Sequence, residues 1–224
     1  MGWVRLRGEA HPIPVGKIVC LGQNYAEHAR EMGNPNAPEF FFFLKPASAI
    51  VHDGEPILIP PGVGRVDHEV ELAVVIGSTA RNVPVARAMD HVLGYAPLLD
   101  VTARELQAQA KKQGRPWTAS KGFDTFAPVG TVVPRADVPD PHALAIELRV
   151  NDQIRQRGST SQMVARIPEA IARVSEVMTL ERGDILATGT PAGVGPLHPG
   201  DLAVARIERV GTLSNPVRAQ PKGT

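Results

Sequence analysis

The chain has 224 residues, 43% hydrophobic and 21% charged, with a formal net charge of +1 at pH 7. This length can bury one sizeable core, so we expect a single domain over residues 1–224, opened by a short N-terminal segment at 1–16. The near-neutral charge, with no run of five like charges, argues against proteins that bind nucleic acids or membrane surfaces.

Short strands and a few helices are predicted along the first half of the chain. A buried strand is predicted at 17–21 and a helix at 25–32, with Asn24 as its N-cap and Gly33 as its stop. Residues 68–77 (HEVELAVVIG) give the strongest strand signal. The other predicted elements are strands at 39–45, 56–60 and 95–101 and helices at 85–94 and 102–113.

The second half of the chain contains a predicted hairpin. Its strands lie at 144–151 and 153–156 and meet at a turn on Asn151-Asp152. An amphipathic helix is expected at 168–178, with Pro168 at its tolerated first position, and further strands at 184–188 and 202–207. Many short strands, few helices and no regular βαβ alternation predict an α+β fold rather than a Rossmann fold or a TIM barrel.

Cellular location is predicted from what the sequence does not contain. Cys20 is the single cysteine, which excludes an intramolecular disulfide scaffold. No apolar run approaches the roughly 20 residues of a membrane span, and the first residues do not resemble a signal peptide. A cytoplasmic protein without membrane partners is therefore expected.

Three carboxylates form a candidate metal site. Glu69 and Glu71 lie two residues apart in a strand and so share a face, and both faces of that strand are otherwise apolar. Asp100 ends another apolar stretch. Carboxylates without His or Cys partners suit Mg²⁺, Mn²⁺ or Ca²⁺. Spacing alone also allows a solvated Glu pair and a helix-capping Asp100.

A second candidate site is the pair His28 and Glu31, which share a helix face at a spacing of three. A carboxylate beside an imidazole orients it and raises its basicity, as a general base requires. The alternative is a surface ion pair. The glycine-rich turn 188–195 (TGTPAGVG) offers backbone N–H groups to an anion, or is only a wide turn. Lys45 and Lys121 are candidate cations for substrate charge.

Segments in chain order strengthen these assignments. They are 22–28 (GQNYAEH) with Glu31-Met32, 43–46 (FLKP), 68–72 (HEVEL), 94–104, 117–123, 151–155, 158–163 and 183–195. Together they resemble the fumarylacetoacetate hydrolase family, and most closely its short acylpyruvate hydrolase members, which overlap with oxaloacetate decarboxylases and tautomerases. The likeness covers nearly the whole chain.

The resemblance implies a mixed β-roll with short peripheral helices, a homodimer, and a magnesium- or manganese-dependent enzyme of small keto acids. It implies that Glu69, Glu71 and Asp100 are metal ligands, and that His28, Glu31 and Lys121 are catalytic. It further implies substrate contacts from Gln23, Tyr25, Lys45 and Thr190. Gln23 departs from the arginine that some close relatives carry, which puts the preferred acid in question.

The reaction expected from this resemblance is hydrolytic C–C cleavage of an acylpyruvate. His28, aided by Glu31, would activate water, and the pyruvate enolate would be stabilised by the metal site and Lys121. Oxaloacetate would give the same enolate by losing CO₂, and proton shuttling alone would give keto–enol tautomerisation. The sequence leaves these three outcomes open, and a non-enzymatic ligand binder is the other class.

Overall fold

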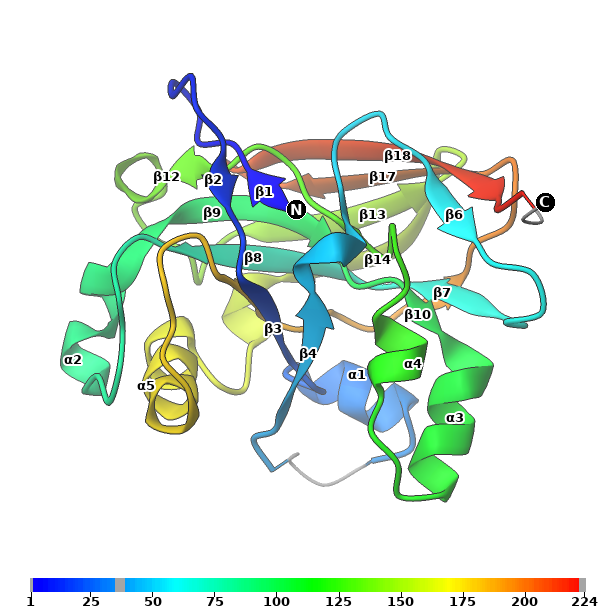
Figure 1. The fold of residues 1–224 in the computed structure, drawn as a ribbon, viewed down its shortest axis with the longest axis horizontal. Helices are drawn as coiled ribbons and strands as arrows, with labels where there is room; N and C mark the ends of the chain where they lie inside the picture. Colours follow the sequence, from blue (N-terminus) through cyan, green and yellow to red (C-terminus); the bar gives the residue numbers. More distant parts are fainter. Residues whose placement is uncertain (1, 35–38, 222–224) are drawn as a thin grey trace.

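A six-stranded mixed sheet forms the centre of the protein in the computed structural model, which describes residues 2–34 and 39–221 (Figure 1). Neighbouring strands are antiparallel except for one parallel pair, β15 and β3. The strands, in spatial order, are β12 (Val133–Pro134), β9 (Val92–Leu99), β8 (Val70–Ile76), β15 (Ile185–Ala187), β3 (Lys17–Leu21) and β4 (Phe42–Pro46).

A five-stranded sheet packs against one face of this central sheet. Its order is β14 (Gln153–Ser159), β13 (Ala145–Val150), β17 (Leu202–Ile207), β18 (Gly211–Ala219) and β6 (Ile57–Ile59). Strands β13, β17 and β18 contact β8 and β9 of the central sheet. The β13–β14 hairpin turns at Asn151 and Asp152, whose φ angles of 51° and 64° match the left-handed backbone of a type I′ turn.

Three small sheets complete the strands. The first joins β7 (Val66–His68) to β10 (Thr102–Ala103) and β16 (Gly195–Pro196). The others pair β1 (Trp3–Val4) with β2 (Ile13–Pro14) and β5 (Ile50–Val51) with β11 (Ala127–Pro128). The β7 sheet matters most for function because it ends beside the three carboxylates.

Two hydrophobic clusters cover the two faces of β8. Val70, Leu72, Val74 and Ile76 belong to the cluster shared with the five-stranded sheet and α5. Ala73 and Val75 belong to a second cluster, which includes side chains of the N-terminal segment such as Val4 and Ile13. Every residue of β8 is buried. The expectation of a strand covered on both sides is confirmed.

The described residues form five short α-helices, which lie along one side of the molecule, opposite the five-stranded sheet (Figure 1). They are α1 (Ala26–Glu31), α2 (Val85–Ala88), α3 (Arg104–Lys112), α4 (Thr118–Lys121) and α5 (Ile167–Val177). Single 3₁₀ turns occupy Ala47–Ala49, Met89–His91, Arg135–Asp137 and Thr160–Gln162. Among the described residues, no helix is long and apolar enough to cross a membrane.

The predicted α+β class with short peripheral helices is confirmed, and most predicted strands are present. The strand expected at 68–77 is broken at Glu69, which separates β7 from β8. The helix expected at 85–94 was too long, because the chain joins the central sheet at Val92. Residues 102–103 form strand β10 rather than the start of α3.

The predicted role of Asn24 as an N-cap was wrong. Tyr25 precedes α1, and no side chain caps that helix end. The Asn24 side chain instead donates to the carbonyls of Ala165 (3.0 Å) and Thr188 (2.9 Å) and accepts from the Ala165 N–H (2.7 Å). Three bonds to distant segments outweigh one local cap, and they attach the start of α1 to the protein interior.

Candidate active site

Strand register brings Glu69, Glu71 and Asp100 together. In the antiparallel β8–β9 pair, Val70 lies opposite Leu99, so the next residues outward, Glu69 and Asp100, are also neighbours. The Asp100 N–H donates to the Glu69 carbonyl at 2.9 Å. Glu71 follows Glu69 by two residues, so its side chain points to the same side as that of Glu69. One oxygen from each carboxylate falls within 4.8 Å of the others, and all three side chains are buried.

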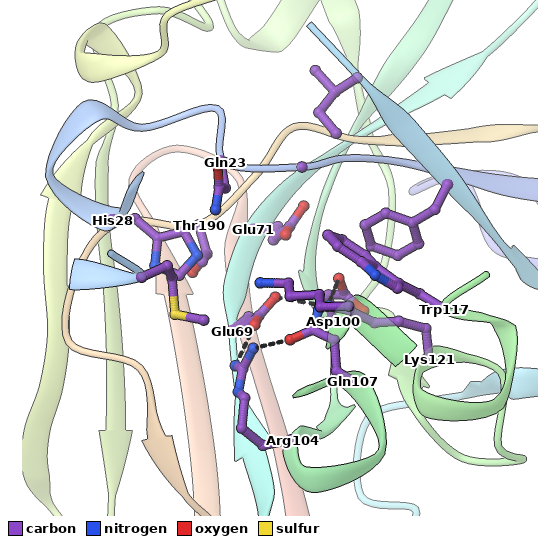
Figure 2. A pocket seen from close by; sticks show the side chains of 15 residues that line it. Gln23, His28, Glu69, Glu71, Asp100, Arg104, Gln107, Trp117, Lys121 and Thr190 are labelled. Atoms are coloured by element: carbon purple, nitrogen blue, oxygen red, sulfur yellow. Dashed lines mark hydrogen bonds and ion pairs between the residues drawn. The ribbon is translucent and has the colours of Figure 1, made fainter. Parts of the chain in front are cut away.

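Three buried or half-buried cations compensate this negative charge, and two of them, Lys121 and Arg104, are drawn in Figure 2. The Lys121 Nζ bridges Glu69 at 2.9 Å and Asp100 at 2.5 Å. Arg104 binds the other Glu69 oxygen at 2.5 Å, and Lys45 Nζ binds Asp100 at 2.6 Å. Within the described part of the chain, Glu71 forms no ion pair and accepts one hydrogen bond, from the Gly189 N–H at 2.7 Å.

The surroundings of the two glutamates therefore shift their pKa values in opposite directions. Burial disfavours the charged form of both, but Lys121 and Arg104 hold the pKa of Glu69 below its ordinary range. Burial, and then the neighbouring Asp100 and Glu69, raise the pKa of Glu71 well above its ordinary value. Crowded, oxygen-only and partly uncompensated, the three carboxylates fit a hard divalent cation.

His28, on α1, lies on another wall of the same cavity, and Glu31 is on the same helix. The His28 Nδ1 is 3.2 Å from a Glu31 carboxylate oxygen, and the ring is nearly buried beside Thr190 (Figure 2). Because Nδ1 faces a carboxylate, it carries the proton, and Nε2 is left as the basic nitrogen. The Gly193 N–H donates to Glu31 at 3.1 Å, so the carboxylate is held from two sides.

The glycine-rich turn 188–195 connects these two walls. Its N–H groups bind protein carboxylates, Gly189 to Glu71 and Gly193 to Glu31. Both glycines have positive φ angles, 89° and 97°. A Cβ on Gly193 would lie 2.3 Å from the Arg155 carbonyl oxygen, so only glycine fits there.

The cavity between the walls is small, with about 20 Å³ of free volume. That is room for about one water-sized particle, so a keto acid needs side chains or α1 to move. The Gln23 amide also borders it: its oxygen accepts from Asn34 at 3.1 Å, which leaves the nitrogen toward the cavity (Figure 2). The lining includes the predicted Gln23, His28, Glu69, Glu71, Asp100, Lys121 and Thr190.

Tyr25 and Lys45, expected to contact substrate, are not among the lining residues. Lys45 is fully buried behind Asp100 and also donates to the Val101 carbonyl at 2.9 Å. The Tyr25 ring packs in the main core, and its buried hydroxyl has no partner among the described residues. Their positions suit support of the site rather than contact with a ligand.

Sequence reasoning assigned no role to several side chains that line the cavity. Arg104, Gln107 and Lys111 of α3 face it, and Trp117 closes one side. Arg104 joins the site by binding Asp67 (2.8 Å) and Gln107 (2.7 Å) as well as Glu69. Positions 104, 107 and 111 fall on one helix face, directly after Asp100, and this polar stripe was the available signal.

The family model described as fumarylacetoacetate hydrolase C-terminal matches residues 17–218. The chain is 50% identical over 190 residues to the mitochondrial oxaloacetate tautomerase FAHD1 of Homo sapiens, covering 85% of this chain and 86% of the relative.

Two solved structures are also similar. The fumarylpyruvate hydrolase from Pseudomonas aeruginosa, in complex with Mn²⁺ and pyruvate, has a TM-score of 0.94 and 37% identity, covering 97% of this chain and 96% of that one. The 5-carboxymethyl-2-hydroxymuconate delta-isomerase from Mycobacterium smegmatis has a TM-score of 0.84 and 42% identity, covering 94% of this chain and 82% of that one.

Proposed function

Because the chain belongs to the fumarylacetoacetate hydrolase family and is an enzyme of that family, we propose that it uses a divalent cation to hydrolyse a C–C bond in acylpyruvates. One observation carries this proposal: the carboxylate cluster and His28, whose Nδ1 faces Glu31, border the same small cavity. A ligand-binding protein without turnover has no need of an oriented base beside its cation site.

Glu69, Glu71 and Asp100 are the proposed ligands, and Mg²⁺ or Mn²⁺ is the proposed cation, with Ca²⁺ a further candidate. The similar fumarylpyruvate hydrolase, described with Mn²⁺ and pyruvate, supports this choice. A divalent cation held there would supply positive charge that favours and stabilises an enolate form of the substrate.

Polar groups of the cavity are proposed to hold the keto acid. The Thr190 hydroxyl and the Gln23 amide nitrogen both face the cavity and suit the substrate carboxylate as hydrogen-bond donors. The Lys121 ammonium is fixed between Glu69 and Asp100, and these two carboxylates, outweighing the effect of burial, raise its pKa above the ordinary range. It stays charged at neutral pH and stabilises negative charge on the departing enolate.

His28 is the proposed general base. Its Nε2 takes a proton from water, which attacks the distal carbonyl of the acylpyruvate. Glu31 fixes the tautomer through Nδ1 and stabilises the imidazolium that forms. The same proton is then available for the leaving carbon, which completes cleavage to pyruvate and a carboxylic acid.

Oxaloacetate tautomerisation or decarboxylation is the second candidate. The 50% identical human relative is named an oxaloacetate tautomerase. A cavity of about 20 Å³ also needs to widen less for a compact four-carbon acid than for a longer acylpyruvate. A neighbouring cavity of about 180 Å³, which shares Leu21, Gly22 and Gln23 and is lined by Phe40 and Phe41, offers space for a longer acyl group and favours the hydrolase.

A substrate panel separates these activities. We expect the protein with Mg²⁺ or Mn²⁺ to release pyruvate from acylpyruvates faster than it releases CO₂ from oxaloacetate or interconverts its keto and enol forms. If either oxaloacetate reaction is faster than acylpyruvate hydrolysis, the result would favour an oxaloacetate tautomerase or decarboxylase. No turnover of any member would overturn both and leave a binding protein.

A homodimer is also predicted from the family likeness, and the cytoplasmic location expected from the sequence stays a prediction. Light scattering at micromolar concentration tests the dimer, and a monomeric mass would contradict it. The relatives include mitochondrial forms, so location needs its own measurement.

A further inference from the structure

A buried glutamine, Gln156, stands out on β14. Its neighbours Gln153, Ile154, Arg155 and Arg157 are exposed, whereas Gln156 is 1% exposed. The strand thus places an amide in the interior and leaves an isoleucine outside. Burying an amide is costly unless all its hydrogen bonds are made, so this inversion needs a specific reason.

All four hydrogen-bonding positions of the Gln156 amide are used. Its oxygen accepts from the Val70 N–H at 3.1 Å and from His68 Nδ1 at 3.0 Å. Its nitrogen donates to the Pro191 carbonyl at 2.8 Å and to the Thr190 hydroxyl oxygen at 2.7 Å. A backbone N–H can only donate and a backbone carbonyl can only accept, so the amide has one allowed orientation.

This fixed orientation determines the direction of the Thr190 hydroxyl. The Thr190 oxygen must accept from the Gln156 nitrogen, so its own proton points elsewhere. Among residues 2–34 and 39–221, the hydroxyl donates to no protein acceptor. Thr190 lines the cavity between His28 and the carboxylates, where that proton is presented to a ligand (Figure 2).

We propose that Gln156 is a positioning residue: it forces the Thr190 hydroxyl to act as a donor to the carboxylate of the bound keto acid. Hydrogen bonds from His68 and Val70 fix the orientation of the Gln156 amide, and the amide in turn fixes the direction of the Thr190 hydroxyl. The inference rests on the proposed function, since it assumes a keto-acid ligand in this cavity. Gln156 itself does not touch that ligand.

A double-mutant cycle tests the proposal. The variants are Gln156→Glu, Thr190→Val and both together, with Gln153→Glu as a matched control on the exposed face of β14. Each Mn²⁺-loaded protein is titrated with oxalate by calorimetry, and KM and kcat are measured on an acylpyruvate. In Gln156→Glu the carboxylate oxygen accepts from Thr190 and turns the hydroxyl proton away from the ligand.

We expect Gln156→Glu to weaken oxalate binding about 10- to 100-fold, the effect of losing one hydrogen bond to a charged group. KM should rise by a similar factor with a much smaller change in kcat. In the Thr190→Val background the same substitution should change affinity less than about threefold, because no hydroxyl remains to be turned. Gln153→Glu should match the wild type.

Gln156→Leu is a second variant that adds no charge. It shows whether the effect of Gln156→Glu arises from the added charge or from misfolding. It removes all four hydrogen bonds but leaves the hydroxyl free to rotate, so it should weaken oxalate binding less than Gln156→Glu while lowering the melting temperature more. Should Gln156→Glu not fold, the cycle is run with Gln156→Leu, whose loss should again vanish in the Thr190→Val background.

Equal losses in both backgrounds, or no loss in either, would overturn the proposal. Wild-type protein that binds neither oxalate nor pyruvate would overturn the proposed function and this inference with it. Wild-type binding combined with a failed cycle would overturn this inference alone.

Discussion

The two walls of the cavity are held in place by different means. The carboxylate wall lies at the junction of β7, β8 and β9, where every residue of β8 is buried and backbone register sets the spacing. The base wall is α1, a helix of six residues with exposed Ala26, Glu27 and Arg30. It is attached through the Asn24 side chain, the buried Tyr25 and the contact between Gly193 and Glu31.

This difference indicates that the two walls have separate roles. A site built on buried strands in fixed register holds its geometry before any ligand arrives, which suits cation binding. A short helix with few attachments opens at lower cost, which suits admission of substrate to a cavity of about 20 Å³. Substitutions on the two walls should therefore have separable effects.

His28→Ala should give the largest effect on chemistry. Loss of the general base should slow acylpyruvate hydrolysis on the order of 10²–10⁴-fold. Oxaloacetate decarboxylation should fall less, because it needs no activated water. Steady-state rates on both substrates check this, with Glu27→Ala on the exposed side of the same helix as control.

Equal decreases in the rates of acylpyruvate hydrolysis and oxaloacetate decarboxylation would mean that α1 must close before either reaction occurs. Unchanged hydrolysis would remove His28 from the mechanism. Glu31→Ala should follow the His28 pattern with a smaller amplitude, since it orients the imidazole through Nδ1.

Glu71→Gln should act on the other wall. We expect divalent cation affinity to fall at least about 100-fold, beyond the 10- to 100-fold typical of losing a group that only supports a ligand. The protein should stay folded, because the substitution removes one of three crowded carboxylates. Calorimetric titration with Mn²⁺ measures this, with surface Glu147→Gln as control; an unchanged affinity would exclude Glu71 as a ligand.

Asn24→Ala should loosen the base wall and spare the carboxylate wall. Loss of its three hydrogen bonds should cost about 1–3 kcal/mol of stability. Hydrolysis should slow on the order of 10-fold to 10²-fold through misplacement of α1. Mn²⁺ affinity should stay at the wild-type value, and a fall in that affinity would show that the two walls are not independent.

The smallest expected effect concerns stability without cation. The pKa of Glu71 is raised in the folded state, so its contribution is lost as pH rises above its ordinary value of 4.5, where the unfolded chain releases the proton first. Metal-free Glu71→Gln should therefore melt a few degrees above metal-free wild type at pH 7, and the gap should shrink toward pH 4.

Saturating Mn²⁺ should reverse that order, because only the wild type gains the free energy of cation binding. Thermal melts of both proteins over this pH range, with and without Mn²⁺, give the measurement. A gap that widens toward pH 4 would contradict the assignment of the raised pKa to Glu71.

Much of the carboxylate wall could be predicted from the sequence, because strand periodicity is local. The two-residue spacing of Glu69 and Glu71 and the apolar run before Asp100 indicated that wall, but only the β8–β9 register shows that they meet. Long-range contacts were not predictable: Asn24 reads as a helix cap yet binds Ala165 and Thr188. Gln156 reads as an ordinary polar residue of a hairpin strand, since its four partners lie far away in the sequence.

Cation-dependent turnover tests the central claim most directly. The wild-type protein is stripped with EDTA, freed of chelator and titrated with Mn²⁺ while pyruvate release from an acylpyruvate is followed. We predict no turnover in the stripped protein and full recovery at one cation per chain. Full turnover in the presence of EDTA would contradict the account, whatever the substrate.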